Sequence, residues 1–317
     1  MMKLDGVAAF VAAAEAGSIS EAARRLNLSK SVVSERLAEL ERSLGASLLH
    51  RTTRKLNLTE DGTAFLERAS AIVRDVDAAV ADIAERRGTL AGPLRISAPV
   101  TFGHLHLGPA LYPFLAQHPQ IELTLELDDR RVDAAADGYD AVLRHGVIAD
   151  TRLMAWRLAP SRRLLVAAPD YLEKHGTPRS AQELERHRGI SYTNRGVADW
   201  RFAKAAPRSA IGVDSSGMGA SGAETVIVRA KIGLRVNNGD MIRDATIAGL
   251  GISLLPSFIA GAAIKTGALR VIDIGIATEP EVIYLAHPEG RHASAKLRAL
   301  AESLRQAFGD PPYWDRY

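Results

Sequence analysis

The chain has 317 residues, a hydrophobic fraction of 47%, a mean hydropathy of -0.03 and a net charge of +3. This length and composition fit two or three globular domains that are soluble in water. No apolar run approaches the roughly 18 residues of a membrane-spanning helix, and the N-terminus lacks a secretory pattern, so we expect a cytoplasmic protein with no membrane partner. The absence of cysteine excludes thiol redox sensing and thiolate metal ligands.

Two short helical patterns follow one another in the first sixth of the chain. Ser18 can cap the first helix, and Glu21, three residues later, can complete a capping box. Ser29 can cap the second helix. The apolar residues of this second helix recur at spacings of four, three and four, and they are Val33, Leu37, Leu40 and Leu44.

The corner between these helices is short, since only Asn27 and Leu28 separate them. The small side chains of Ala22 and Ala23 permit the two helices to cross closely. The pattern predicts a helix-turn-helix, and an ordinary helical hairpin in a core is the alternative.

A basic ribbon follows the second helix. Gly45 can end that helix, and residues 51–59 can form a short ribbon, which makes the unit a winged helix. Residues 18–58 contain eight Lys and Arg against four Glu, an excess that exceeds the net charge of the whole chain. This excess is small for a DNA-binding surface, because useful affinity takes about 6 to 10 phosphate contacts. We therefore expect two copies to act together.

The chain resembles LysR-type transcriptional regulators from end to end. The matching stretches are "FVAAAEAGSISEAARRLNLSKSVVSERLAELERSLGASLLHRTTRKLNLTEDG", "GPLRISAPVTFG", "YPFLAQHPQIELTLEL", "DGYDAVLRHG", "LVAAPDYLEKHGTP" and "AGLGISLLP". The resemblance implies an all-α winged helix-turn-helix (residues 1–60), a linker and dimerisation helix (61–88) and an α/β effector domain (92–317) of two subdomains like those of periplasmic binding proteins. It also implies double-stranded DNA, a small-molecule effector, a homodimer or homotetramer, and RNA polymerase as a further partner.

The resemblance also places the DNA contacts. The solvent-facing side of the second helix would read bases, with the wing on the backbone or in the minor groove. The expected DNA-binding residues are Lys30, Ser31, Ser34, Glu35, Arg36, Arg51, Arg54 and Lys55. Glu35 departs from the basic or amide residues that are frequent at this position, and it can accept from cytosine N4. The alternative is that Glu35 pairs with Lys30, or lies beside Glu39, facing solvent.

A heptad pattern runs through residues 63–87. Its seam consists of Phe65, Ala69, Ile72, Val76, Ala79 and Ile83, and Leu66, Val73 and Val80 supplement it. The resemblance implies that this helix pairs two subunits, whereas an amphipathic helix packed on its own domain is the alternative. Residues 86–93, "RRGTLAGP", read as a hinge.

Strands and helices alternate after the hinge. The strand patterns include "LRIS", "IELTLEL", "DAVL", "RLLVAAP" and "GISLLP", and their alternation with helices predicts parallel sheets with ligands at the carboxyl ends of the strands. The resemblance implies subdomain I (about 92–161 and 269–317) and subdomain II (about 162–268), joined by crossovers near residues 159–163 and 267–269. The effector would lie between the two subdomains.

Eight residues are candidates for effector binding, on the strength of the resemblance and of their place at strand and helix ends. They are Ser97, Val100, Thr101, Phe102, Arg144, Asn194, Trp200 and Asn238. Loop capping is the alternative role for the first four, and a core role for Trp200. Arg144 and the neighbouring His145 follow the strand "DAVL" and could attract an acidic ligand, or they could be surface or subunit contacts. We therefore expect a small organic acid as effector.

No cofactor and no metal are expected. His104 and His106 are two residues apart, but no nearby carboxylate or cysteine completes a metal site. Residues 204–233 depart from the family pattern, and "SSGMGASGAE" within them predicts a flexible loop. A solute receptor for transport is the alternative function, but it would have a secretion signal and no winged helix. An enzyme would need a nucleophile, a phosphate loop or paired carboxylates, none of which the motifs indicate.

Overall fold

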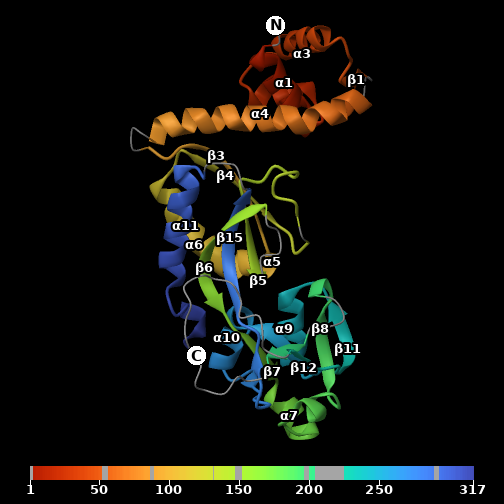
Figure 1. Ribbon diagram of the computed structural model, residues 1–317, viewed down its shortest axis with the longest axis vertical. Coiled ribbons are helices and arrows are strands. Elements are labelled where there is room, and N and C mark those ends of the chain that lie inside the picture. The colour runs from red at the N-terminus through yellow and green to blue at the C-terminus, as the bar shows by residue number, and fades with distance from the viewer. Residues whose placement is uncertain are drawn as a thin grey trace.

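The computed structural model describes residues 3–51, 56–85, 89–130, 132–146, 152–195, 200–203, 225–288 and 293–317. Figure 1 shows a small helical domain, a long helix beneath it and a larger α/β domain, which contains two five-stranded sheets and a small three-stranded one. This arrangement confirms the predicted fold class. No described helix has both the length and the apolar character that crossing a membrane requires.

The N-terminal domain is a winged helix. Its elements are α1 (Leu4–Ala16), α2 (Ile19–Arg25), α3 (Lys30–Leu44) and the antiparallel strands β1 (Leu49–Arg51) and β2 (Leu56–Leu58). The core contains Ala22 and Ala23, as the close crossing requires, together with residues of α1 such as Phe10. Asn27 has a positive φ of 52°, a conformation that asparagine tolerates better than most residues. This residue makes the tight corner between α2 and α3.

The predicted helix ends agree with the structure in most details. The side chains of Ser18 and Ser29 accept from the backbone N–H groups of Glu21 and Val32, both at 3.4 Å, and Gly45 ends α3 in the left-handed conformation. The reciprocal half of the capping box is wrong, because the Glu21 carboxylate pairs with Arg24 instead. Leu44 was expected in the core but is 38% exposed, because it is the last residue of α3.

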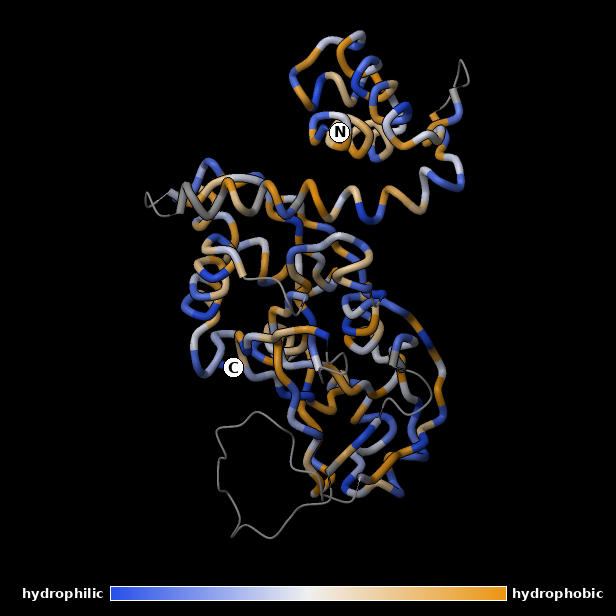
Figure 2. Tube along the Cα trace, turned by 45° about the horizontal axis from the view of Figure 1, so that its top comes forward, coloured by the Kyte–Doolittle hydropathy of each residue, from blue (hydrophilic) through white to orange (hydrophobic). Residues whose placement is uncertain are grey.

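In the long helix α4 (Glu60–Glu85), one part of the heptad pattern packs on the winged-helix domain and another part is exposed. Phe65, Leu66, Ala69 and Val73, mostly from its first half, belong to or pack against the winged-helix core. Ile72, Val76 and Val80 are 40%, 37% and 63% exposed. The tube in Figure 2 shows hydrophobic positions continuing along this helix beyond the N-terminal domain. The side chain of Ile83 and residues 86–88 lie outside the described part of the chain.

Subdomain I contains a five-stranded sheet. Its order is β4-β3-β5-β15-β6, formed by β3 (Gly92–Ala98), β4 (Ile121–Leu127), β5 (Ala141–Gly146), β6 (Leu153–Ser161) and β15 (Glu281–Pro288). Helices α5 (Val100–Phe102), α6 (Gly108–Gln117) and α11 (Ala295–Phe308), the π-helical turn η1 (Gly103–Leu107) and the short C-terminal helix η3 (Tyr313–Asp315) complete it. Gly92 and Pro93, expected in the hinge, begin β3. Arg144 and His145 lie within β5, because the strand continues past "DAVL".

Subdomain II contains a second five-stranded sheet of order β11-β8-β12-β7-β13. Its strands are β7 (Arg163–Ala167), β8 (Arg188–Tyr192), β11 (Lys231–Val236), β12 (Ile252–Pro256) and β13 (Arg270–Val271). The helices are α7 (Pro169–His175), α8 (Ala181–Leu184), α9 (Gly239–Ile247) and α10 (Ser257–Lys265), with a 3-10 turn η2 (Thr193–Arg195). A small sheet joins β9 (Arg201–Ala203), β10 (Thr225–Ile227) and β14 (Ala277–Thr278).

The sheets are mixed, so the expectation of parallel sheets is wrong in part. β3 is parallel to β4 and β5, and β8 is parallel to β11 and β12. β15 is antiparallel to β5 and β6, and β7 is antiparallel to β12 and β13. The antiparallel strands include β6, β7 and β15. These strands flank the two points at which the chain passes between the subdomains, and no helix connects the strands there.

The first crossover lies where the resemblance implies it, and the second does not. The chain passes from β6 to β7 at Arg162. The return was expected near residues 267–269, but β13 pairs with β7 and β14 pairs with β9. The chain therefore re-enters the first sheet only between Thr278 and Glu281. The boundary drawn at residue 269 is wrong because two very short strands still belong to subdomain II. The "SSGMGASGAE" segment lies outside the described residues.

Candidate DNA-reading surface and effector site

The second helix of the winged-helix domain, α3, presents a polar face to solvent. Val33, Leu37 and Leu40 are at most 2% exposed and fix the opposite face of α3 in the core. On the outer face, Lys30, Ser31 and Glu35 are exposed and Ser34 is partly buried. Among the described residues, Glu35 forms no ion pair with Lys30. The hydroxyl of Ser31 lies 2.8 Å from that of Ser29, and Lys30, Ser34 and Glu35 complete a polar face that is open to a partner outside the chain.

Arg36 differs from the other residues expected at the DNA. Its guanidinium lies 3.0 Å from the carboxylate of Asp5 in α1, and its side chain is 31% exposed. The pair ties α3 to α1, so Arg36 faces its own domain. In the wing, Arg51 is the last residue of β1, its side chain is not described, and Arg54 and Lys55 lie outside the described residues.

Asp240 links the two subdomains of the effector domain. Thr101 donates to its Oδ2 at 3.0 Å, and the Nε2 atom of His104 lies 2.8 Å from the same oxygen. Arg243, one turn along α9, donates to Oδ1 at 2.8 Å. Burial opposes ionisation of Asp240, but the hydrogen bonds from His104 and Thr101 and the charges of His104 and Arg243 outweigh it and lower its pKa.

The backbone around Asp240 permits this close approach. Asn238 caps α9 by accepting from the N–H of Met241 at 3.0 Å. A Cβ at Gly239 would lie 2.6 Å from Ile259 and 3.0 Å from the hydroxyl of Thr101. Only glycine fits there without displacing its neighbours. Asn238, which was expected to touch the effector, thus has a capping role that places α9 against Thr101.

A second set of contacts surrounds Asp129, two residues after the end of β4. Its Oδ1 accepts from the backbone N–H of Val100 at 3.0 Å, and its carbonyl oxygen accepts from Asn194 at 3.2 Å. Burial is the main cause of the raised pKa of Asp129, and the nearby carboxylates of Asp128 and Asp240 add to it. Val100 and Asn194, expected from opposite subdomains, therefore meet at one aspartate.

Arg144 is a mostly buried cation beside Ser97. Its guanidinium donates to the hydroxyl of Ser97 at 3.1 Å and to the carbonyl of Leu143 at 2.8 Å. Burial lowers its pKa. Within the described chain no carboxylate reaches ion-pair distance of this guanidinium. The neighbouring His145 has another environment, since its Nε2 lies 2.9 Å from the buried carboxylate of Glu281.

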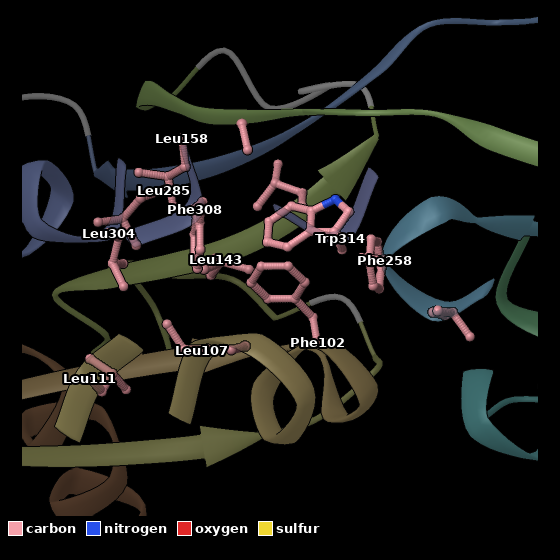
Figure 3. Packing of buried hydrophobic residues seen from close by; sticks show 14 of the residues in the cluster. Phe102, Leu107, Leu111, Leu143, Leu158, Phe258, Leu285, Leu304, Phe308 and Trp314 are labelled. Atoms are coloured by element: carbon pink, nitrogen blue, oxygen red, sulfur yellow. The ribbon is translucent and has the colours of Figure 1, made fainter. Parts of the chain in front are cut away.

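Two aromatic candidates lie in cores. Phe102 is 1% exposed, and its ring makes edge contacts with Phe258, Phe308 and Trp314 at centroid distances of 5.1 to 5.8 Å (Figure 3). Trp200 is 2% exposed in the core of subdomain II. Both side chains are inaccessible to a ligand in this conformation, because almost none of their surface is exposed. Large aromatic rings stabilise a core strongly when they are buried.

The two histidines after Phe102 have separate roles. His104 contacts Asp240, whereas His106 is buried between the hydroxyl of Tyr313 at 2.7 Å and the carbonyl of Phe258 at 2.8 Å. Burial lowers the pKa of His106, so the ring is held neutral. The described residues contain no group of three His, Asp or Glu side chains arranged for a metal.

Sequence reasoning missed Asp129 and Asp240 at this junction. Asp129 could have been found, because it follows the carboxyl end of the strand "IELTLEL", where ligand contacts gather in such sheets. Asp240 lies in the first turn of α9 after Asn238. Its link to Thr101 spans 139 residues of sequence, which no local pattern reveals.

A winged helix-turn-helix followed by a long helix and a two-subdomain α/β domain defines a ligand-responsive transcriptional regulator. The family model "Bacterial regulatory helix-turn-helix protein, lysR family" matches residues 4–63, and the model "LysR substrate binding domain" matches residues 87–309. The chain belongs to the LysR family of transcriptional regulators.

Similar proteins extend over almost the whole chain. An uncharacterized HTH-type regulator of Haemophilus influenzae is 31% identical, over 95% of this chain and 99% of that protein. PtxR of Pseudomonas aeruginosa is 31% identical, over 98% of this chain and 95% of PtxR. The solved structure of CrgA from Neisseria meningitidis is 26% identical, with a TM-score of 0.58 over 96% of this chain and 98% of CrgA. These relatives are transcriptional regulators, and none supports a transport receptor.

Proposed function

We propose that α3 reads an operator in duplex DNA through Lys30, Ser31, Ser34 and Glu35. The observation that carries this proposal is the exposed polar face of α3, whose opposite face is anchored by three buried side chains. A helix held in this way can enter a major groove. Arg51, Arg54 and Lys55 of the wing supply phosphate contacts in this proposal, and Arg36 positions α3 through Asp5.

The effector is a small organic acid bound between the two subdomains. Arg144 supports this class of ligand, because it is a mostly buried guanidinium without a carboxylate partner among the described residues. The carboxylate of a ligand could pair with the Arg144 guanidinium through two parallel hydrogen bonds. Ser97, Thr101, Val100, Asn194 and Asn238 would surround the ligand or shape its site, whereas Phe102 and Trp200 support it from the cores.

Coupling between the two sites follows from the contacts at Asp240. A ligand that binds one relative orientation of the subdomains more tightly than another shifts the population toward it. The Thr101, His104 and Asp240 contacts exist in one such orientation. Their strengthening or loss would move subdomain II relative to the sheet that carries β3, which contacts α4. The output at DNA would change accordingly.

Two chains act together in this proposal, as a homodimer or as half of a homotetramer. The support is the exposed apolar surface of α4 at Ile72, Val76 and Val80. A paired helix would set the distance between two α3 helices for successive major grooves. The protein would act in the cytoplasm without catalysing a reaction, with RNA polymerase as a further partner and no membrane.

Binding to promoter DNA tests the first part. Lys30→Ala and Ser34→Ala should each weaken binding to the native operator by about 1 to 3 kcal/mol and relax sequence preference. Arg54→Ala should weaken binding to all sequences and reduce the salt slope by about one. Fluorescence anisotropy at several salt concentrations measures both effects. Unchanged affinity and slope in all three variants would overturn the assignment of α3 and the wing.

A thermal-shift screen of aromatic and aliphatic acids tests the second part. An acid that raises the unfolding temperature of the native protein should lose this effect in Arg144→Gln. Arg130→Gln is the matched control, because Arg130 is exposed and pairs with Asp128. Equal stabilisation of both variants would place the ligand away from Arg144.

A further inference from the structure

A surface cavity of about 350 Å³ lies in subdomain II, apart from the junction between the subdomains. It is formed where α7 ends, where the connection passes to α8, and where β8 begins. In Figure 1, α7 lies at the opposite end of the molecule from α3. The lining residues that bear on binding are Tyr171, Thr177, Glu183, Arg186, His187 and Arg188. Its volume falls at the lower end of the range of small-molecule sites.

Two arginines of this cavity stand out by their charge environment. Within the described residues, neither Arg186 nor Arg188 forms an ion pair, whereas Arg95, Arg130 and Arg243 do. Arg188 lies beside the backbone of Gly233, where a Cβ would be 2.9 Å from its guanidinium. Glycine at this position leaves room for the guanidinium. Gly233 itself does not line the cavity, whereas Arg186 and Arg188 both do. The two positive charges at or beside the cavity create a local attraction for an anion.

The inner wall of the cavity is fixed by Tyr171, which is 4% exposed. Its hydroxyl accepts from the N–H of Arg188 at 3.1 Å and lies 3.3 Å from Nδ1 of His187. The phenol can then donate to Nδ1, so the neutral ring carries its hydrogen on Nε2. Burial and the nearby His175 lower the pKa of His187, which keeps the ring neutral. His175 packs on the Tyr171 ring at a centroid distance of 4.5 Å.

We propose that this cavity binds a small hydroxylated phosphate monoester. The guanidinium groups of Arg186 and Arg188 and the ring N–H of His187 are all donors, and a phosphoryl group offers acceptor oxygens in several directions. A planar carboxylate offers only two such oxygens. Glu183 also lines the cavity, and one of its oxygens accepts from the N–H of Arg179. Its carboxylate repels a phosphoryl group but accepts from a hydroxyl, as does the side chain of Thr177, which assigns the organic part of the ligand to that side.

Calorimetric titration of DNA-free protein with glycerol 3-phosphate and with inorganic phosphate tests the proposal. Glycerol 3-phosphate should bind, and Arg186→Gln should weaken it about tenfold, as loss of one charge-assisted contact predicts. The double variant Arg186→Gln with Arg188→Gln should abolish measurable binding. Arg179→Gln is the matched control, since Arg179 is exposed in the same segment but does not line the cavity.

The outcomes separate phosphoryl recognition from other binding. Weaker binding of inorganic phosphate with the same dependence on Arg186 supports the proposal and shows the contribution of the organic part. Absence of binding by either compound overturns it, as does binding that is equal in Arg186→Gln and Arg179→Gln. Because Arg186 is exposed, its substitution should leave the unfolding temperature unchanged, which a thermal melt of the same samples verifies. Operator binding does not enter this test.

Discussion

The two halves of α4 carry the same apolar repeat but differ in what covers it. In the first half, the ring centroids of Phe65 and Phe10 are 5.6 Å apart, and Ala69 is fully buried. Farther along the helix, Val76 and Val80 remain exposed. The repeat thus marks which face of a helix is apolar, but it does not say whether that face contacts its own domain or a second chain. The packing interpretation applies to the first part of the helix, whereas the pairing of two subunits through the exposed part stays a prediction.

The largest expected effect concerns self-association, which we assign to the exposed part of α4. Val76→Glu together with Val80→Glu should weaken self-association on the order of a hundredfold or more, because each chain would place two carboxylates in an apolar interface. Sedimentation analysis over a range of protein concentrations measures it. Asp75→Asn is the control, since Asp75 is an exposed residue of the same helix. Unchanged association of the double variant would assign dimerisation to another surface.

The next effect concerns the half that packs on its own domain. Phe65→Ala should reduce the free energy of unfolding of the winged helix by about 2 kcal/mol, less than for a fully buried phenylalanine because Phe65 is only partly buried. Self-association should persist below the unfolding temperature. Phe65→Leu, which keeps most of the apolar volume, should recover much of the loss. Denaturant unfolding followed by circular dichroism gives both values, and a loss of association at full stability would contradict the division of α4.

A polar contact between distant segments sharpens the same contrast. Asp240→Asn should cost about 1.5 kcal/mol near pH 7, because charge-assisted hydrogen bonds to Thr101 and His104 weaken. The folded state lowers the pKa of Asp240 below its ordinary value of 3.8. The contribution of Asp240 to the free energy of unfolding is therefore complete above pH 3.8. This contribution is lost as the pH falls through the lowered pKa of the folded state. Unfolding measured at several pH values should show the native protein and the variant converging in acid, and a constant gap would argue against an ionised Asp240.

The smallest effect concerns a contact confined to one turn. Ser29→Ala should cost about 0.5 to 1 kcal/mol, since it removes the acceptor of the Val32 N–H at the start of α3. Ser29→Asp should restore most of it, because aspartate is also a good N-cap. Thermal unfolding of the three proteins ranks them. A loss as large as that of Phe65→Ala would show that Ser29 does more than cap α3.

Sequence patterns predicted the fold well where the determining residues are neighbours. Ser18, Ser29 and Gly45 mark helix ends as expected. The strand patterns named in the sequence begin within two residues of β3, β4, β5, β7 and β12, whereas β6, β8, β13 and β15 were not predicted. The return crossover was misplaced because β13 and β14 have two residues each and no pattern of their own. Arg36 was expected at the DNA because helix spacing indicates which face of a helix a side chain lies on. Helix spacing does not reveal an ion-pair partner in another helix, which here is Asp5 of α1.

The candidate effector site was predicted only in part. Thr101 contacts Asp240 of subdomain II, and Val100 and Asn194 both contact Asp129, but neither aspartate was foreseen. Binding of an effector by these residues stays a prediction. Phe102 follows Thr101 directly and yet points into the core. Adjacent residues on a short helix diverge by about 100°, so membership of a binding segment does not decide which side chains face the ligand.

By itself the sequence determined helix ends, apolar faces and the order of domains, because a cap or a repeat depends on residues a few positions apart. The tertiary structure decided which apolar residues pack within the chain, and it decided that residues 139 positions apart, Thr101 and Asp240, form a hydrogen bond. Such contacts exist only after two subdomains have packed, and that packing results from many small burial terms spread over the whole chain.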